Sequence, residues 1–173
     1  MRIWTLQPDG SVTVLAPHLG RIRQSNLGGW RIVLDDDLAT SIQERRRASL
    51  PNETGGILVG VFDAMRQVIS IVDALPPPPD SKGSASGFER GVEGGQEYLS
   101  EIAKQSGGMV RYVGEWHTHP KGHCARPSAV DLKQLLLLRS ELRREGLPAT
   151  MLIAGEDEVS MVQLMDDLSG SAD

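Results

Sequence analysis

The sequence predicts an α/β domain, because apolar runs of strand type alternate along it with amphipathic helical patterns. Residues 57–62 form an apolar run too short for a helix, and residues 109–116 have the pattern of a second strand. Helical spacing of apolar residues covers residues 37–49 and 128–145. A chain of 173 residues, of which 39% are hydrophobic, suffices for one core of ordinary size.

The first third of the chain reads as strands followed by a helix. Residues 2–6 and 11–15 alternate around Pro8-Asp9-Gly10, whose residue types favour a hairpin turn. A third strand is expected over residues 30–34. Three aspartates then supply a cap and a dipole-stabilising charge for the helix over residues 37–49, which Pro51 ends.

The middle of the chain contains a buried strand and a loop. Gly55 and Gly56 lead into the strand over residues 57–62, and they permit close approach of another backbone. An antiparallel strand is expected over residues 68–72. Four consecutive prolines follow, and residues 80–87 are expected to be a mobile loop that acts as a lid or partner contact.

The last part of the chain begins with a glycine-interrupted helical pattern over residues 88–106. The strand over residues 109–116 comes next. Ser128 and Asp131 fit the N-cap and third positions of a capping box that starts the next helix. A final hairpin over residues 149–154 and 159–164 completes one domain over residues 1–165, with a flexible tail over residues 166–173.

Composition narrows the possible functions. A formal net charge of −5 supplies no basic surface for nucleic acid or for an anionic membrane. The arginine cluster at residues 45–47 is expected to lie on a solvated helix face. A single cysteine excludes an internal disulfide framework, and no apolar run approaches the length of a membrane span. We therefore expect a soluble cytoplasmic protein that binds neither nucleic acid nor membrane.

The chemistry-bearing stretch is the sequence Gly-Glu-Trp-His-Thr-His-Pro at residues 114–120. Because side chains repeat with period two on an extended segment, His117 and His119 point the same way. Asp131, a short loop away, can complete a site of three protein ligands. Two imidazoles and one carboxylate suit Zn²⁺, and three ligands leave the fourth position open, as in catalytic zinc sites.

A metallohydrolase also needs a base that moves protons, and the sequence offers two glutamates. Glu115 lies on the histidine strand, whereas Glu53 precedes a separate buried strand. A different arrangement is a closed structural zinc site in which His123 and Cys124 join the two histidines. That arrangement would leave Asp131 unused, so Cys124 is expected to pack or to line the rim of the site.

Together, the upstream Glu53, His117-x-His119-Pro120, seven residues and Ser128-x-x-Asp131 resemble the JAMM signature of the JAB/MPN-domain metalloproteases. The resemblance covers residues 34–164. It implies an MPN/JAB-type, cytidine-deaminase-like sandwich with a curved mixed β-sheet flanked by helices. It also implies one Zn²⁺ on His117, His119 and Asp131, with Glu53 as general acid/base and Ser128 as donor to the oxyanion. Glu115 then has a supporting or structural role.

The chain further resembles the small bacterial members that occur with activating- and conjugating-enzyme-like proteins in ubiquitin-like conjugation systems, including antiphage defence systems. Phe88-Glu89-Arg90, after the proline-rich loop, shares in this resemblance, and Phe88 and Arg90 are expected to bind substrate. The implied function is a zinc isopeptidase or peptidase that cleaves after the C-terminus of a ubiquitin-like protein. Three alternatives stay open: a peptidase acting on a sulfur-carrier protein, a non-catalytic MPN scaffold, and a RadC-like protein associated with DNA repair.

Overall fold

The computed structural model describes residues 3–6, 9, 11–15, 22–27 and 29–164. Within these residues, the main sheet has seven strands in the order β11-β10-β9-β5-β6-β4-β3. Neighbouring strands are antiparallel except for the parallel pairs β9–β10 and β4–β6. The strands are β3 (Ile22–Leu27), β4 (Trp30–Asp35), β5 (Gly55–Asp63), β6 (Val68–Ala74), β9 (Arg111–Thr118), β10 (Ala149–Ala154) and β11 (Val159–Leu164).

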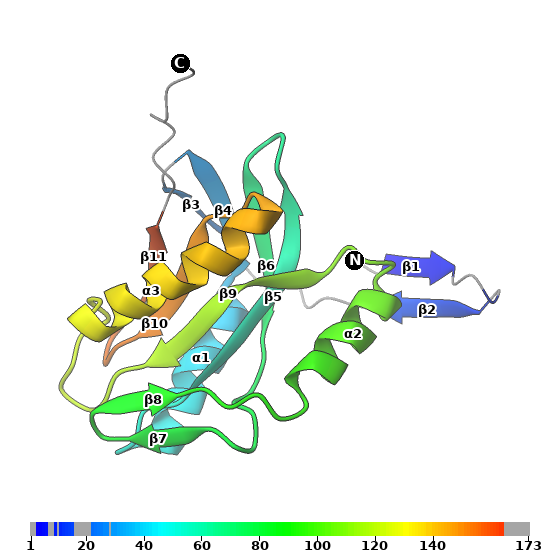
Figure 1. Ribbon diagram of the computed structural model, residues 1–173. Coiled ribbons are helices and arrows are strands. Elements are labelled where there is room, and N and C mark those ends of the chain that lie inside the picture. Colours follow the sequence, from blue (N-terminus) through cyan, green and yellow to red (C-terminus); the bar gives the residue numbers. More distant parts are fainter. Residues whose placement is uncertain (1–2, 7–8, 10, 16–21, 28, 165–173) are drawn as a thin grey trace.

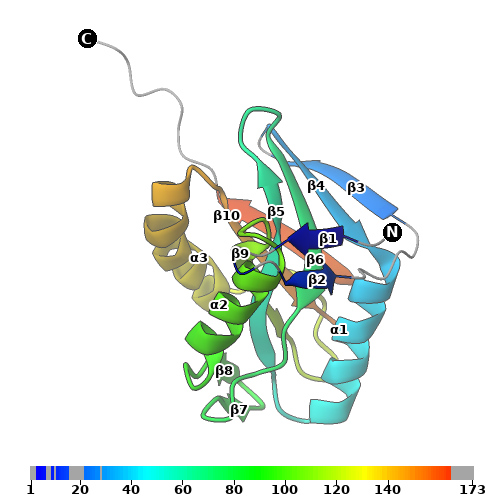
Figure 2. The ribbon, with the colours of Figure 1, turned by 90° about the vertical axis from the view of Figure 1, so that its right-hand side faces the viewer.

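The helices cover both faces of this sheet. The helix α1 (Asp36–Ser49) lies on one side, and α2 (Gly95–Gln105) and α3 (Ala129–Leu142) lie on the other (Figures 1 and 2). A short 3₁₀ turn, η1 (Arg143–Glu145), continues α3. The sequence-based expectation of a mixed, curved sheet flanked by helices is confirmed. In the described part of the chain, no helix is both long and apolar enough to cross a membrane.

Two small hairpins lie outside the main sheet. The strands β1 (Ile3–Leu6) and β2 (Val12–Leu15) pair as expected, and β2 contacts α2. The strands β7 (Lys82–Ser84) and β8 (Gly87–Glu89) pair in the segment expected to be an irregular loop. That expectation is wrong, as is the predicted helix start at residue 88, because Phe88 belongs to β8 and α2 begins at Gly95. The expected tail at residues 166–173 lies outside the described residues.

The centre of the sheet is formed by β5 and β9, whose middle residues are buried on both faces. A Cβ atom on Gly55 would lie 2.5 Å from the Trp116 carbonyl oxygen, and one on Gly56 would lie 2.3 Å from that of Leu75. The expected close backbone approach at these two glycines is therefore confirmed. It allows the strand after Glu53 to pack tightly against the strand that carries the histidines.

Local sequence also explains where α1 and α3 begin. The side chain of Asp35 accepts a hydrogen bond from the Asp37 N–H and caps α1. Ser128 and Asp131 form the predicted capping box at the start of α3. The end of β9 and the first turn of α3 thereby meet at one edge of the sheet face that carries α2 and α3.

Candidate metal centre

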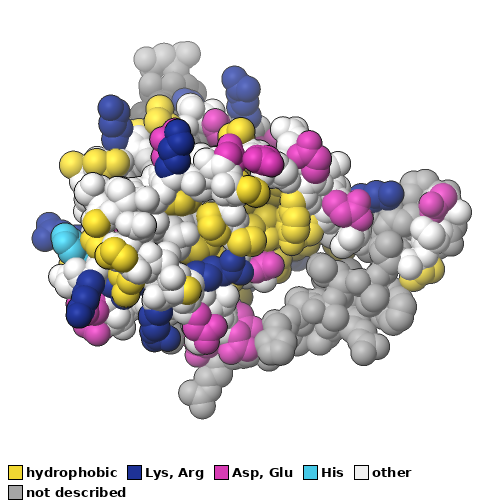
Figure 3. Space-filling view, turned by 90° about the horizontal axis from the view of Figure 1, so that it is seen from below, with side chains coloured by type: hydrophobic (Ala, Val, Ile, Leu, Met, Phe, Trp, Pro, Cys, Tyr) yellow, Lys and Arg dark blue, Asp and Glu magenta, His cyan; other side chains and the backbone are white. Residues whose placement is uncertain are grey.

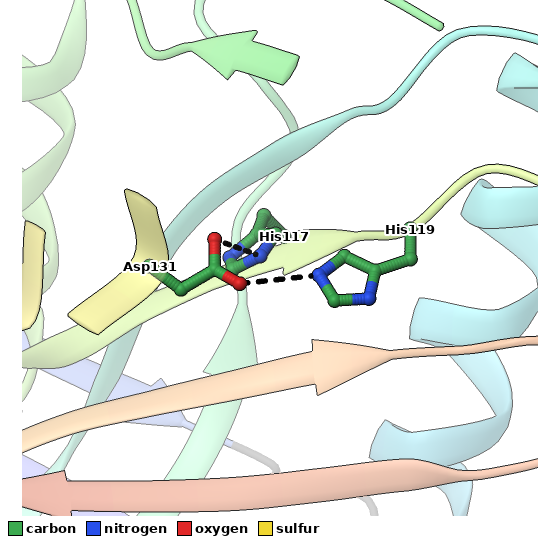
Figure 4. Close-up of side chains that lie close together, drawn as sticks. All are labelled: His117, His119 and Asp131. Carbon is green, nitrogen blue, oxygen red and sulfur yellow. Dashed lines mark hydrogen bonds and ion pairs between the residues drawn. The ribbon is translucent and has the colours of Figure 1, made fainter. Parts of the chain in front are cut away.

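Three buried side chains from two elements converge at the end of β9 (Figure 4). His117 belongs to β9, and His119 follows it, with its N–H continuing the ladder to the Ala154 carbonyl oxygen at 2.8 Å. Asp131 comes from the first turn of α3. Its Oδ1 lies 3.1 Å from His117 Nε2, and its Oδ2 lies 3.3 Å from His119 Nε2. The three ligand atoms lie within 4.8 Å of one another.

The imidazole nitrogens are arranged as a metal site requires. His119 Nδ1 lies 2.7 Å from the Cys124 carbonyl oxygen, which can only accept a hydrogen bond. Nδ1 is therefore protonated, which leaves Nε2, 3.3 Å from Asp131 Oδ2, as the ring nitrogen that would bind a metal. His117 Nε2 is buried and makes no hydrogen bond to any described residue, although it lies near the Asp131 carboxylate. A buried nitrogen without a hydrogen bond is what a metal ion would satisfy.

The donor set and its spacing fit a zinc ion. Ligand atoms about 2.0–2.1 Å from zinc at tetrahedral angles lie about 3.3 Å apart, and the two nitrogen–carboxylate separations agree with that spacing. Burial opposes ionisation of Asp131, but the adjacent histidines and the Ser128 N–H lower the pKa of its carboxyl well below the usual range. The carboxylate form, which a metal ligand needs, is therefore favoured.

Asp131 makes two hydrogen bonds with Ser128 besides its contacts with the histidines. Its Oδ2 accepts a hydrogen bond from the Ser128 N–H at 2.6 Å, and its own N–H donates to Ser128 Oγ at 3.2 Å. The capping box therefore fixes the carboxylate and places the Ser128 hydroxyl next to it. One short motif thus both begins the helix and brings Ser128 and Asp131 to the centre.

A buried arginine supports the segment that carries His119. Arg46 donates from Nε to the His119 carbonyl oxygen at 2.8 Å and from Nη2 to that of Pro120 at 2.9 Å. It is 3% exposed, so the expectation that the whole arginine cluster is solvated is wrong. Arg46 follows Leu38 and Ile42 at intervals of four residues on the buried face of α1, and this spacing was the signal for its burial.

Glu53 is held beside the centre by the residue that follows it. The Thr54 N–H donates to Thr118 Oγ1 at 3.0 Å, and the Thr118 N–H donates to the Thr54 carbonyl oxygen at 2.8 Å. Burial raises the pKa of the Glu53 carboxyl, and the charges of His117 and His119 partly oppose that rise. Glu53 is thus a half-buried carboxyl group in electrostatic contact with the convergent histidines.

Glu115 points to the same sheet face but is engaged elsewhere. Its Oε1 accepts a hydrogen bond from Arg90 Nε at 2.8 Å, and its Oε2 accepts one from Gln134 Nε2 at 2.6 Å. Tyr112 Oη also lies 3.4 Å from Oε1. Glu115 is buried within this network, with 4% of the residue exposed. Glu115 therefore joins β9 to α3 and to the segment after β8; the resemblance implied a supporting or structural role for it but did not name these partners.

The remaining sequence-based candidates lie around the centre. Phe88 lies against Gly55, where a Cβ atom would come within 2.8 Å of its ring. His123 and Cys124 are both exposed, and Cys124 contributes its carbonyl group to His119. Among the described residues, the convergent group contains His117, His119 and Asp131 only. The alternative of a closed histidine-cysteine site, which the sequence disfavoured, therefore has no geometric support among the described residues.

Two hollows share Arg90, and neither is lined by Glu53, His117, His119 or Asp131. The face seen from below in Figure 3 carries a hydrophobic area flanked by basic and acidic side chains. One hollow of about 260 Å³ is lined by the proline run at residues 76–79, Leu75 and Tyr98. A second, of about 380 Å³, is lined by Val92, Leu99 and Tyr112. Arg90 and Ile57 line both, so the hollows meet beside the Arg90–Glu115 ion pair.

Residues 35–165 match the family model described as prokaryotic homologs of the JAB domain. The chain belongs to the prokaryotic JAB family. The matched range contains the convergent group of His117, His119 and Asp131. It also contains Glu53 and Ser128. The resemblance drawn from the motif alone is confirmed.

Curated relatives of this JAB chain carry the name CD-NTase/cGAS isopeptidase. One from Enterobacter hormaechei is 34% identical over 70% of this chain and 66% of its own length. Those from Escherichia coli and Pseudomonas aeruginosa are 32% and 30% identical over 62% and 61% of this chain, and each is covered over 64% of its length. The JAB chain thus matches slightly less than two thirds of the length of each of these relatives.

Proposed function

We propose that this chain is a zinc-dependent isopeptidase or peptidase that cleaves after the C-terminus of a ubiquitin-like protein. The observation that carries the proposal is the buried convergence of His117, His119 and Asp131 beside Glu53 in a chain of the prokaryotic JAB family. The name shared by its relatives supports hydrolysis of an isopeptide bond. We extend the proposal to a conjugate of a ubiquitin-like protein with a CD-NTase/cGAS-type enzyme in an antiphage system, alongside activating- and conjugating-enzyme-like proteins.

In the proposed mechanism, the three metal ligands and Glu53 have separate roles. His117, His119 and Asp131 would hold a zinc ion, which supplies Lewis acidity that polarises the scissile carbonyl and acidifies the attacking water. Glu53 takes a proton from that water as the water oxygen bonds to the carbonyl carbon, and it passes the proton to the leaving amine nitrogen as the C–N bond breaks. Because burial raises the pKa of Glu53, the carboxyl group exchanges protons more readily near neutral pH than an exposed glutamate does.

Ser128 stabilises the oxyanion in this proposal. Its Oγ accepts the hydrogen bond of the Asp131 N–H, which fixes the oxygen at the start of α3. The hydroxyl hydrogen is then available to donate toward the carbonyl oxygen as negative charge develops on it. A fixed donor aimed at a developing oxyanion contributes about 10²-fold to 10³-fold to kcat in other hydrolases.

The substrate tail is proposed to lie extended beside the β7–β8 hairpin. Phe88, against Gly55, and Arg90, at the junction of the two hollows, would line its path. Backbone hydrogen bonds to an extended tail supply affinity, and small residues at its end fit between such walls. Side-chain selection by a single deep pocket is not needed in this arrangement, because the folded body of the ubiquitin-like protein adds contact surface.

The test uses the partner ubiquitin-like protein fused through its C-terminus to a reporter. We expect cleavage at the junction by the zinc-loaded protein, none after chelation, and restored cleavage when zinc is returned. Glu53→Gln, loaded with zinc, is the matched control, with cleavage slowed about 10²-fold to 10⁴-fold. Failure of the zinc-loaded wild type to cut either this fusion or a conjugate with a CD-NTase would reject the proposal.

A second comparison tests recognition of the folded body. The isolated tail peptide should be cleaved with a much lower kcat/KM than the folded fusion. Equal kcat/KM values for the tail peptide and the folded fusion would indicate a general peptidase that does not recognise the folded body. Preferential cleavage of a sulfur-carrier protein fused to the same reporter would instead support action on that carrier.

A further inference from the structure

The backbone of β7 packs directly against Glu53. The Glu53 N–H donates to the Ser84 carbonyl oxygen at 2.8 Å. A Cβ atom on Gly83 would lie 2.2 Å from the Glu53 carbonyl oxygen, so only glycine fits there without a shift. On its other side, Glu53 is followed by Thr54, which is bonded to Thr118 at the end of β9. The Glu53 backbone is therefore held between the hairpin and the histidine strand.

The second arm of the hairpin is anchored independently. Phe88 in β8 packs on Gly55, two residues after Glu53. Arg90, just after β8, donates to the buried Glu115 carboxylate and to the Gly91 carbonyl oxygen. An ion pair with one side chain 5% exposed and the other 29% exposed is screened less by solvent than a surface pair. These contacts fix the hairpin to β5 and β9.

We propose that the β7–β8 hairpin is a positioning element for Glu53, acting through the backbone contact of Gly83 and Ser84. This inference rests on the proposed role of Glu53 as proton carrier. Glu53 precedes β5 and so lies outside the sheet ladder that fixes Gly55 and the residues after it. The hairpin restrains Glu53, because its backbone makes a hydrogen bond to Glu53, which lies outside the sheet. Gly83 and Ser84 thus affect catalysis by positioning Glu53, and they do not act on the metal ligands.

Two glycines of the same hairpin provide a matched test. Gly83→Ala forces the hairpin away from Glu53, whereas a Cβ atom on Gly87 meets nothing within 4 Å. With the fusion substrate, Gly83→Ala should lower kcat about 10-fold to 100-fold with little change in KM, because small misplacement of a catalytic group has effects of this size. Gly87→Ala should retain wild-type kcat. Both variants should bind zinc with wild-type stoichiometry.

The mechanism of the effect is tested in a Glu53→Gln background. If the hairpin acts through Glu53, Gly83→Ala adds no further loss of kcat once Glu53 has been replaced, so the two changes are not additive. Full additivity would overturn the inference. A defect confined to KM would also overturn it, since it would make the hairpin a substrate wall only.

A readout independent of activity uses the metal-free protein. Hydrogen exchange of the Glu53 amide, which donates to Ser84, should be about 10-fold faster in Gly83→Ala and unchanged in Gly87→Ala. Ser84→Ala is a milder second variant, because the hydrogen bonds of the exposed Ser84 Oγ to described residues are local to the turn, with the Ser86 N–H, the Ser86 hydroxyl and the Gly87 carbonyl oxygen. It should raise Glu53 exchange to a smaller extent. Unchanged Glu53 exchange in both Gly83→Ala and Ser84→Ala would overturn the inference, whereas an inactive wild type with the expected exchange pattern would overturn only the proposed function.

Discussion

Replacement of Arg46 by methionine tests whether this buried guanidinium stabilises the segment that carries His119. In the folded protein, two of its nitrogens donate to the carbonyl oxygens of His119 and Pro120 at 2.8 and 2.9 Å. Methionine has a side chain of similar length, so it can occupy the same space. It cannot donate a hydrogen bond, and both carbonyl oxygens then lose these partners.

The magnitude follows from these contacts. Hydrogen bonds from a charged donor contribute about 1.5–3 kcal/mol each, so the two together contribute about 3–6 kcal/mol. Burial of an apolar methionine side chain offsets about 1.5–3 kcal/mol of that loss. We therefore expect the free energy of unfolding to fall by about 1.5–3 kcal/mol in Arg46→Met. This is a large part of the total stability of a typical domain, which is about 5–15 kcal/mol.

Urea unfolding of the metal-free protein, followed by circular dichroism, measures this loss. Arg47→Met is the matched control, because Arg47 is the exposed neighbour on the same helix, and it should change stability by less than about 0.5 kcal/mol. A zinc competition titration should show about 10-fold to 100-fold weaker binding in Arg46→Met, since the His119 backbone has lost its support. Equal unfolding midpoints and equal zinc affinities in the two variants would refute the reasoning.

Three further predictions concern the metal, the proton carrier and a loop anchor. His119→Ala and Asp131→Asn should each lose most bound zinc, whereas Cys124→Ser should keep it, as measured by elemental analysis. Full zinc occupancy in both ligand variants would contradict the assignment of His119 and Asp131 as ligands. Glu53→Gln should lower kcat about 10²-fold to 10⁴-fold with zinc retained, and Glu115→Gln should do less; the reverse order would make Glu115 the base. Asp80 accepts the N–H groups of Val92 and Glu93, which lower the pKa of its carboxyl. Its stabilising effect is therefore fully present above the unfolded pKa of about 3.9 and is lost as pH falls through the lower folded pKa. The stability difference between wild type and Asp80→Ala should thus be seen at pH 7 and shrink in acid, and an equal difference at both pH values would contradict this account.

Several sequence-based predictions failed where distant contacts outweigh local pattern. The glycines and prolines at residues 76–95 indicate a loop and a weak helix start, yet two short strands form there. Their pairing is stabilised by contacts with Glu53 and Glu115, which are far away in sequence. The strand β3 was not predicted either, and it pairs with β4 at one edge of the sheet. A local sequence pattern does not show which distant residues a segment will contact.

The sequence by itself determined the parts of the site that depend on local geometry. Period-two alternation predicts that His117 and His119 share a side of their strand, and the capping box places Ser128 and Asp131 together at a helix start. The family and the predicted mixed sheet follow from the same motif, and both are confirmed. Only the tertiary structure decided which groups surround these residues. Arg90, from the segment after β8, and Gln134, from α3, engage the Glu115 carboxylate, while Glu53 stays beside the histidines. Arg46 became a buried support because α1 packs its side chain against the His119 segment. These outcomes depend on hydrogen bonds between residues far apart in the chain, and such bonds are fixed by how the sheet and helices pack.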